Sequence, residues 1–325
     1  MITNLLILLV VLAFTIGAGW LTVKAVRAKR LWVKIVGGLL AGALTLLLGA
    51  LTFAGAKGLM IVYYPGVAPA PTLTVVGTPE QIARGEYIVG ISCLGCHGSF
   101  PNGLEGAPEY PLVGGVNLAE AEGFGFVGRL ATENLTPGGK LANYTDGEIF
   151  RALRHGVDKN GQVLGFMSLI SVGELSNEDL EALIAFLRAQ PAATTDSPTG
   201  DKIGFIGLVF WGAGMFPAPQ DRPDVISAPP SGPTAEYGKY VATIGDCRGC
   251  HGSDMTGTPA SPAGPAVPNP RPLVGQLTLE EFIKMFRSGV RPDGTAFPAA
   301  MPWQSAAAMT DGDLAGLYAY LTTAP

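Results

Sequence analysis

The feature that most constrains this chain is a five-residue signature, Cys-x-x-Cys-His, that occurs twice. The first copy lies in ISCLGCHG at residues 91–98, and the second lies in GDCRGCHG at residues 245–252. These signatures contain all four cysteines and two of the three histidines of the 325-residue chain, so no cysteine remains for a disulfide or a separate reactive thiol. The sequence therefore predicts two similar sites that use cysteine and histidine together.

The signatures belong to a longer internal repeat. Three pairs of segments match. The first pair is GEYIVGISCLGCHG and GKYVATIGDCRGCHG, with one residue inserted, and the second is EIFRALRHGVDKNG and EFIKMFRSGVRPDG, without a gap. The third is NEDLEALIAFLRAQP and DGDLAGLYAYLTTAP, in which Pro191 pairs with Pro325. This repetition predicts one module used twice, at residues 79–192 and 233–325, with a Pro-rich inter-domain linker at residues 193–232.

Each module is expected to be mainly α-helical, with long loops rich in Gly and Pro. Ser176 with Asp179, and Thr310 with Asp313, have the spacing of helix N-caps. The apolar positions that follow recur at helical spacing and predict one buried face: Leu180, Leu183, Ile184, Leu187, Leu314, Leu317, Tyr318 and Leu321. So few helices bury only a small core, which a large apolar cofactor in the interior would complete.

The chemistry of Cys-x-x-Cys-His favours haem. The two thiols lie about one helical turn apart and can add to the vinyl groups of one haem, while the adjacent histidine binds the iron. We therefore expect two covalently attached haem c groups, at Cys93, Cys96 and His97 and at Cys247, Cys250 and His251. A Cys₄ zinc site is the main alternative, although the two cysteine pairs are 154 residues apart. A thioredoxin-like redox pair is the other.

A second iron ligand is expected for each haem, and methionine is a common partner to histidine in electron-carrying cytochromes. Met167 and Met301 each lie 12 residues before the paired aspartate of the last helix. They are therefore the predicted ligands, so that the metal-binding residues are His97, Met167, His251 and Met301. The other methionines of the second module, Met255, Met285 and Met309, have no counterpart in the first and are expected to be surface or core residues.

Three further residues, His155, Arg154 and Arg287, are expected near the two sites. His155 competes with Met167 for the first haem, but its repeat partner is Ser288, and a surface or helix-end position is expected for it instead. The repeat also pairs Arg154 with Arg287. Each arginine would either bind a haem propionate or lie on a solvated helix face.

The N-terminal region differs from the rest. Residues 2–23 and 35–56 are each 22 residues long without a charge, and each exceeds the ~20 residues that a membrane-spanning helix needs. We expect a transmembrane hairpin at residues 1–64, with spans at about 2–23 and 35–57, followed by a linker at 65–78. A cleaved signal peptide is the alternative, but the chain start has no basic segment. Glycines in the second span permit close helix packing: Gly37, Gly38, Gly42, Gly49 and Gly55.

Charge predicts the orientation of this hairpin. Its connecting segment, KAVRAKRLWVK, carries five positive charges, which the positive-inside rule places in the cytoplasm. Both chain ends and both haem modules then lie on the periplasmic side. Residues 203–220 are also uncharged. A third span there would move the second haem to the cytoplasm, so we expect this stretch to pack between domains or lie at the membrane surface.

Residues 79–325 carry a formal charge of −11, which argues against nucleic-acid binding and suits a basic partner. Both modules resemble class I cytochrome c domains. The stretches ARGEYIVGISCLGCHG, EYGKYVATIGDCRGCHG and RSGVRPDGTAFPAAMPW are similar to the membrane-anchored cytochrome c subunits of bacterial alcohol, sorbitol and gluconate dehydrogenases. The resemblance implies ligation by His97 with Met167 and by His251 with Met301, and electron transfer from a partner enzyme toward quinone or a terminal acceptor.

The sequence therefore predicts a non-enzymatic, membrane-tethered di-haem subunit that relays electrons on the extracytoplasmic side. Its donor would be a dehydrogenase or another subunit of a respiratory or photosynthetic membrane complex, and its other partner a soluble cytochrome, copper protein, quinone or oxidase. A di-haem peroxidase-like enzyme with one open haem is the alternative. An assembly subunit with vestigial haems is a third possibility.

Overall fold

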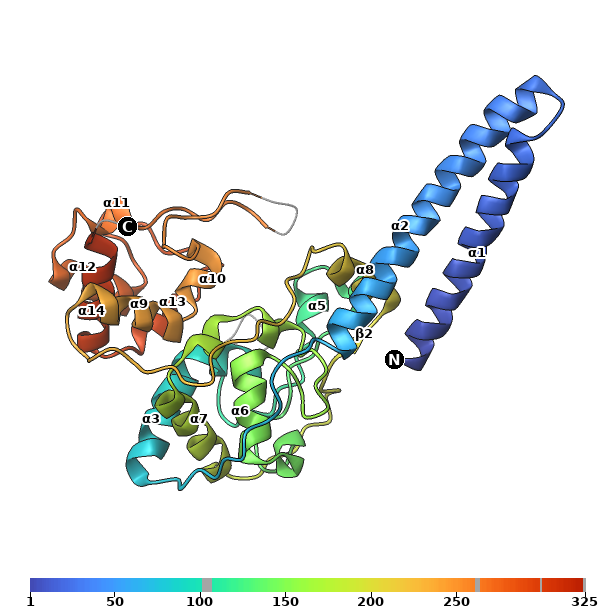
Figure 1. Ribbon diagram of the computed structural model, residues 1–325. Coiled ribbons are helices and arrows are strands. Elements are labelled where there is room, and N and C mark those ends of the chain that lie inside the picture. Colours follow the sequence, from blue (N-terminus) through green and yellow to red (C-terminus); the bar gives the residue numbers. More distant parts are fainter. Residues whose placement is uncertain (101–106, 261–263, 299, 324–325) are drawn as a thin grey trace.

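The computed structural model describes residues 1–100, 107–260, 264–298 and 300–323 (Figure 1). Pro325, which the repeat pairs with Pro191, lies outside these residues. A long helical hairpin projects from a body of short helices and loops. The expected mainly helical fold with two apolar N-terminal helices is confirmed.

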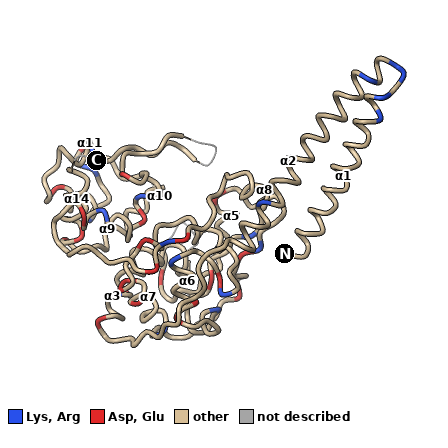
Figure 2. Tube along the Cα trace, in the orientation of Figure 1, with Lys and Arg blue, Asp and Glu red and all other residues tan. Residues whose placement is uncertain are grey.

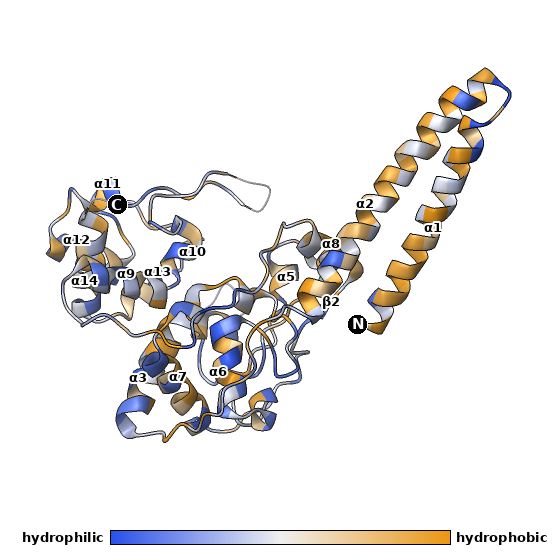
Figure 3. Cartoon of the chain, in the orientation of Figure 1, coloured by the Kyte–Doolittle hydropathy of each residue, from blue (hydrophilic) through white to orange (hydrophobic). Residues whose placement is uncertain are grey.

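The hairpin consists of α1 (Ile2–Val26) and α2 (Gly38–Tyr63), with a short π-helix, η1 (Val33–Gly37), leading into α2. Its basic connecting segment lies at the tip, far from the body (Figure 2). The shafts are apolar along their length (Figure 3). The apolar helical lengths, 25 residues for the first helix and 31 for η1 with α2, are sufficient to cross a bilayer.

Polar and small side chains join the two hairpin helices. Thr15 and Thr52 hydroxyls lie 2.9 Å apart, and those of Thr22 and Thr45 lie 3.0 Å apart. Glycines of α2 face the same side, with Gly42 toward Thr22 and Gly49 toward Thr15. These glycines therefore pack against α1 of the same chain.

The body contains two sets of helices. The first module is built from α3 (Pro79–Ser92), α4 (Leu94–His97), α5 (Leu118–Ala121), α6 (Asp146–His155) and α7 (Asn177–Ala189), with 3₁₀ turns η2 (Gly125–Val127), η3 (Lys140–Asn143), η4 (Phe166–Ser168) and η5 (Ser171–Glu174). The second contains α9 (Ala235–Ile244), α10 (Cys247–His251), α11 (Arg271–Val274), α12 (Leu279–Ser288), α13 (Trp303–Ala307) and α14 (Asp311–Thr322).

In each module the first long helix crosses the last at a glycine. A Cβ on Gly85 of α3 would lie 2.0 Å from the Ala182 carbonyl oxygen of α7, and one on Gly238 of α9 would lie 1.9 Å from that of Gly316 in α14. These two glycines, and the two residues they face, occupy equivalent positions in the repeat. The repeat therefore encodes the same helix crossing twice.

The predicted helix starts are confirmed. Ser176 and Thr310 each accept a hydrogen bond from the backbone N–H three residues later, at 3.1 Å. The apolar face that follows each cap is buried in one hydrophobic core that includes residues of both modules, except that Tyr318 is only half-buried against it. Asp179 and Asp313, however, use their carboxylates for other contacts, which are described below.

The linker contains a two-residue strand and a short helix. Strand β2 (Lys202–Ile203) pairs antiparallel with β1 (Gly128–Arg129) of the first module. Helix α8 (Phe205–Gly212) has eight residues, far fewer than a bilayer crossing requires. It packs on the body-proximal end of α2, where a Cβ on Gly58 would lie 1.7 Å from the Leu208 carbonyl oxygen. The uncharged stretch at residues 203–220 thus joins the hairpin to the first module.

Candidate haem-attachment sites

The first signature lies at the junction of α3 and α4. Cys93 is half-buried there, Cys96 is exposed, and His97 is buried. The Nδ1 atom of His97 lies 2.8 Å from the Glu133 carbonyl oxygen. Because a carbonyl only accepts, Nδ1 carries the hydrogen of a neutral ring, and Nε2 keeps the free lone pair that a metal requires.

The second signature repeats this arrangement. Cys247, Cys250 and His251 lie in α10, and the Nδ1 atom of His251 is 2.9 Å from the Pro268 carbonyl oxygen. A loop carbonyl therefore fixes the histidine tautomer in both modules, with Nε2 free. Orientation by a backbone carbonyl is typical of metal-binding histidines.

The cysteines are free thiols with raised pKa values. Burial raises the pKa of Cys93 and of Cys247 to about 12. The pKa values of the more exposed Cys96 and Cys250 are also raised, by partial desolvation of the sulfur and, to a smaller extent, by the carboxylates of Asp246 and Glu122. A redox-active Cys-x-x-Cys pair has a lowered thiol pKa instead, so this environment does not favour the thioredoxin-like alternative.

The zinc alternative requires the two cysteine pairs to meet. Within the part of the chain that the structure describes, no three side chains of His, Cys, Asp or Glu come together as a metal site would need. All four cysteines are described, and the two pairs lie on different modules. The arrangement therefore favours two separate sites over one shared Cys₄ centre.

The two predicted methionine ligands lie in equivalent loops. Met167 is in η4. Met301 lies shortly before α13, and its N–H donates to the Pro298 carbonyl at 2.9 Å. Both are half-buried against the same apolar core as Cys93 and Cys247. Ligation by these sulfurs stays a prediction. Met255, Met285 and Met309 are buried core residues.

The paired arginines make equivalent contacts in the two modules. Arg154 is fully buried, and its Nη1 donates to the carbonyl oxygens of Gly173 at 2.8 Å and Leu175 at 2.7 Å. Arg287 contacts the Ala307 carbonyl, at the repeat position of Gly173. The solvated face expected for each arginine is wrong for Arg154 and holds for Arg287, which is exposed. Binding of a propionate stays a prediction, and each arginine holds the segment between the methionine and the last helix.

His155 is the last residue of α6, so the expected helix-end position is confirmed, but the side chain is buried and a surface position is wrong. Its Nδ1 lies 3.2 Å from the Gln220 carbonyl oxygen and 3.4 Å from the Arg222 backbone nitrogen. Burial lowers the pKa of His155 and favours its neutral form. The residue fastens the linker to the end of α6, which no local sequence pattern indicates.

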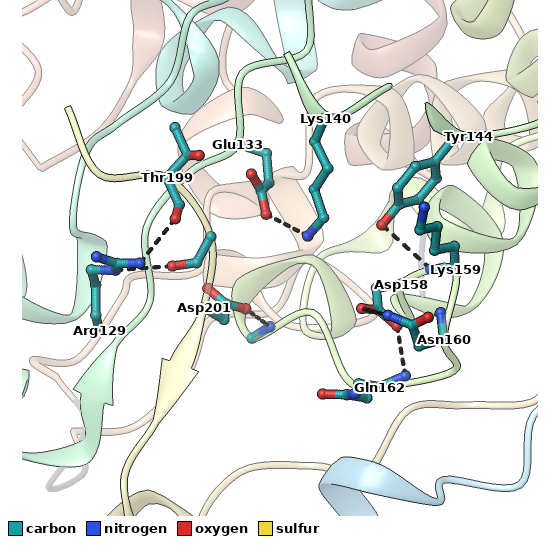
Figure 4. A network of polar contacts seen from close by, with 12 residues as sticks. Arg129, Glu133, Lys140, Tyr144, Asp158, Lys159, Asn160, Gln162, Thr199 and Asp201 are labelled. Atoms are coloured by element: carbon teal, nitrogen blue, oxygen red, sulfur yellow. Dashed lines mark hydrogen bonds and ion pairs between the residues drawn. The ribbon is translucent and has the colours of Figure 1, made fainter. Parts of the chain in front are cut away.

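A polar network that includes Glu133, Lys140 and Asp201 connects to the first site through the Glu133 carbonyl (Figure 4). Glu133, whose carbonyl orients His97, also binds Lys140 through its carboxylate at 2.6 Å. Asp201 of the linker accepts a hydrogen bond at 2.6 Å from the N–H of Gly165, two residues before Met167. Burial raises the pKa of Asp201 to about 6, and the Glu133 charge adds to the shift. Sequence analysis missed Asp201, which lies in an irregular stretch.

The donor set of each site fits haem c. Each has two free thiols one helical turn apart, a histidine with Nε2 available, and a methionine on an equivalent loop. These are the groups that covalent attachment and axial ligation use.

Comparison with known proteins agrees with this chemistry. Residues 233–321 match the family described as cytochrome C oxidase, cbb3-type, subunit III. The chain is 35% identical over 180 residues to the gluconate 2-dehydrogenase cytochrome c subunit of Pantoea cypripedii. The matched segment covers 51% of this chain and 36% of that protein.

Two shorter matches are similar in kind. One is to the cytochrome c subunit of alcohol dehydrogenase (quinone) from Gluconobacter oxydans (strain 621H), 40% identical over 53 residues, or 16% of this chain and 11% of that protein. The other is to the fructose dehydrogenase cytochrome subunit of Gluconobacter japonicus. It is 44% identical over 50 residues, which are 15% of this chain and 10% of that protein.

The matched segments thus cover between about a tenth and a third of the length of these relatives. Together with the family match at residues 233–321, they support a cytochrome c domain in this chain, and such a domain implies covalently bound haem c. The three relatives are named as cytochrome subunits of alcohol, fructose and gluconate dehydrogenases.

Proposed function

We propose that this chain is a membrane-tethered di-haem cytochrome c, with two tandem class I cytochrome c domains, that relays electrons on the periplasmic side. The observation that carries the proposal is the repeated histidine geometry. Nδ1 of His97 and Nδ1 of His251 each meet a loop carbonyl, at 2.8 and 2.9 Å, directly after a Cys-x-x-Cys pair. Because both modules present the same cysteine and histidine arrangement, each would bind one haem.

The residue roles follow from the donor chemistry. Cys93 with Cys96, and Cys247 with Cys250, would form the covalent attachments, and His97 and His251 would bind iron through Nε2. Met167 and Met301 would complete the ligation. Haem c, when bound, supplies one-electron redox chemistry, and with two protein ligands on each iron no position would remain for a substrate. The chain then contributes attachment, burial and placement rather than catalysis.

The hairpin supplies the proposed tether. Its basic tip lies far from the body (Figure 2), and its shafts are apolar (Figure 3) and carry many exposed large hydrophobic side chains. With the tip in the cytoplasm, the body lies on the outer side. The donor would be a dehydrogenase, as the names of the relatives suggest, or another subunit of a respiratory membrane complex. A soluble cytochrome, copper protein, quinone or oxidase would be the other electron partner.

Haem stoichiometry and ligand binding test the proposal. The detergent-purified full chain should contain two haems by pyridine haemochrome assay, and both should titrate reversibly. Met301→Ala should lower one midpoint potential and allow about one equivalent of carbon monoxide to bind. Met215→Ala, at an exposed methionine of the linker, is the matched control and should bind none. One haem per chain, or stoichiometric carbon monoxide binding by the unaltered protein, would contradict the proposal.

A further inference from the structure

Two equivalent tyrosines exchange hydrogen bonds between the modules. Tyr87 of α3 and Tyr240 of α9 occupy matching positions in the repeat, as do Asp179 of α7 and Asp313 of α14. The Tyr87 hydroxyl donates to the Asp313 carboxylate in the other module. The Tyr240 hydroxyl donates to Asp179 Oδ2 at 2.6 Å, again in the other module. Each module therefore gives one hydroxyl and receives one, as the halves of a two-fold symmetric dimer do.

Each aspartate also has a partner within its own module. Arg84 donates to both carboxylate oxygens of Asp179 at 2.8 Å, and Tyr237 donates to Asp313 at 2.5 Å. Arg84 and Tyr237 occupy matching positions of the repeat. Both carboxylates are buried, so each one joins its own first helix to that of the other module. Such buried, shared acceptors are costly to leave unpaired.

The residue before the first cysteine of each signature also crosses the boundary. Ser92, which precedes Cys93, donates to the Ile244 carbonyl of the second module. Asp246, which precedes Cys247, accepts from the N–H of Ser171 in the first module at 2.9 Å. The packing follows the same symmetry. The short element before the last helix of each module contacts the first helix of the other: η5 contacts α9, and α13 contacts α3. Both attachment sites thus border one interface.

We infer that the two modules form an internal, approximately two-fold dimer in which Tyr87 and Tyr240 are positioning residues. Their exchanged bonds to Asp313 and Asp179 hold the two Cys-x-x-Cys-His sites at a fixed separation on either side of the interface. The inference rests on the proposed di-haem function and adds that the sites act as one unit. A flexible pair of modules, by contrast, would leave each site to meet external partners independently.

The test uses the full chain with its haems, in detergent. Tyr87→Phe, Tyr240→Phe and the double variant remove only the cross-boundary hydroxyls and keep the rings. Tyr237→Phe is the matched control, because its hydroxyl binds the same Asp313 carboxylate from within the second module. Two properties are measured for each: the number of thermal unfolding transitions, and the separation between the two haem midpoint potentials.

In the unaltered chain and the Tyr237→Phe control, we expect one cooperative transition for both modules. In the double variant we expect two transitions and a changed separation of the midpoint potentials, because each site loses its fixed neighbour. A double variant that retains one transition and the original separation overturns the inference. A chain with fewer than two redox-active haems contradicts the proposed function instead, so the two failures are distinguishable.

Discussion

The buried guanidinium of Arg154 donates to the carbonyl oxygen of Gly173 at 2.8 Å and thereby anchors the loop that carries Met167. The second module contains the same contact, between Arg287 and Ala307. Each arginine also donates to a side-chain oxygen four residues beyond that carbonyl along the chain. Arg154 donates to Asn177 Oδ1 at 2.7 Å, and Arg287 donates to Asp311 Oδ1 at 2.6 Å. A pair of arginines that the repeat alone identifies thus holds the loop on the methionine side of each site.

Replacing Arg154 with methionine should loosen that loop. The change leaves the Gly173 and Leu175 carbonyls without their charged donor, which we expect to cost about 3 kcal/mol of unfolding free energy. It should also weaken the low-spin absorption of the first haem, because Met167 is no longer held in place. Denaturant unfolding and absorption spectroscopy provide the two measurements.

Arg151→Met is the control, because Arg151 lies on the same helix and donates to Asp158, away from the methionine loop. It should leave the low-spin spectrum intact. If Arg154→Met did so as well, the loop would not depend on this arginine.

His155→Ala should leave both haem spectra unchanged and still reduce stability. His155 is buried against the linker at Gln220 and Arg222, so its removal opens a cavity and frees that segment. We expect a loss of about 2 kcal/mol and faster proteolysis between residues 193 and 232. Ser288→Ala, at the matching position of the second module, should not accelerate that cleavage. A high-spin first haem in His155→Ala would show that His155 is an iron ligand after all.

The parts that the sequence predicted are those that local chemistry decides. Ser176 and Thr310 cap their helices through a backbone N–H three residues away, and the apolar positions after them repeat every three or four residues. Such signals lie within a few residues of one another, and the internal repeat presents them twice. The signature cysteines and histidines were recognised for the same reason.

The parts that the sequence could not supply depend on irregular segments far apart in the chain. The carbonyls that Arg154 binds lie in and just after the short 3₁₀ turn η5, and those that meet His97 and His251 lie in irregular loops. A backbone carbonyl has the same chemistry in every residue, so no residue type marks it as a partner. The exchanged contacts of Tyr87 and Tyr240 likewise follow from how the modules dock, which neither repeat reveals alone.

Gly58→Ala should separate α8 from the hairpin. The new Cβ would lie 1.7 Å from the Leu208 carbonyl oxygen, so the two helices must move apart and expose part of the core around Trp211. We expect a loss on the order of 2–3 kcal/mol in local stability. Hydrogen exchange of the α8 backbone amides should become correspondingly faster.

Gly49→Ala makes the same substitution on the same helix, where the nearest atom is a Thr15 methyl at 4.0 Å. It should leave α8 exchange unchanged. Equal exchange in both variants would mean that α8 does not rely on close approach to α2.

Asp201→Asn should stabilise the first module at neutral pH. Burial raises the pKa of Asp201 to about 6 in the folded chain, against an ordinary value of 3.8, and Glu133 adds to this while Lys140 and Arg129 oppose it. The folded state therefore holds its proton more tightly than the unfolded state. The stability this provides is complete below about pH 4 and is lost as pH rises to about 6, a change of about 3 kcal/mol.

Asparagine cannot ionise, and its side-chain oxygen can still accept from the Gly165 N–H. We therefore expect Asp201→Asn to unfold at a higher temperature than the unaltered chain at pH 7.5 and at the same temperature at pH 4. Asp196→Asn, at an exposed position of the same linker, should show no such difference. If Asp201→Asn were less stable at pH 7.5, the ionised carboxylate would be stabilising the Met167 turn, and the sign of the argument would be wrong.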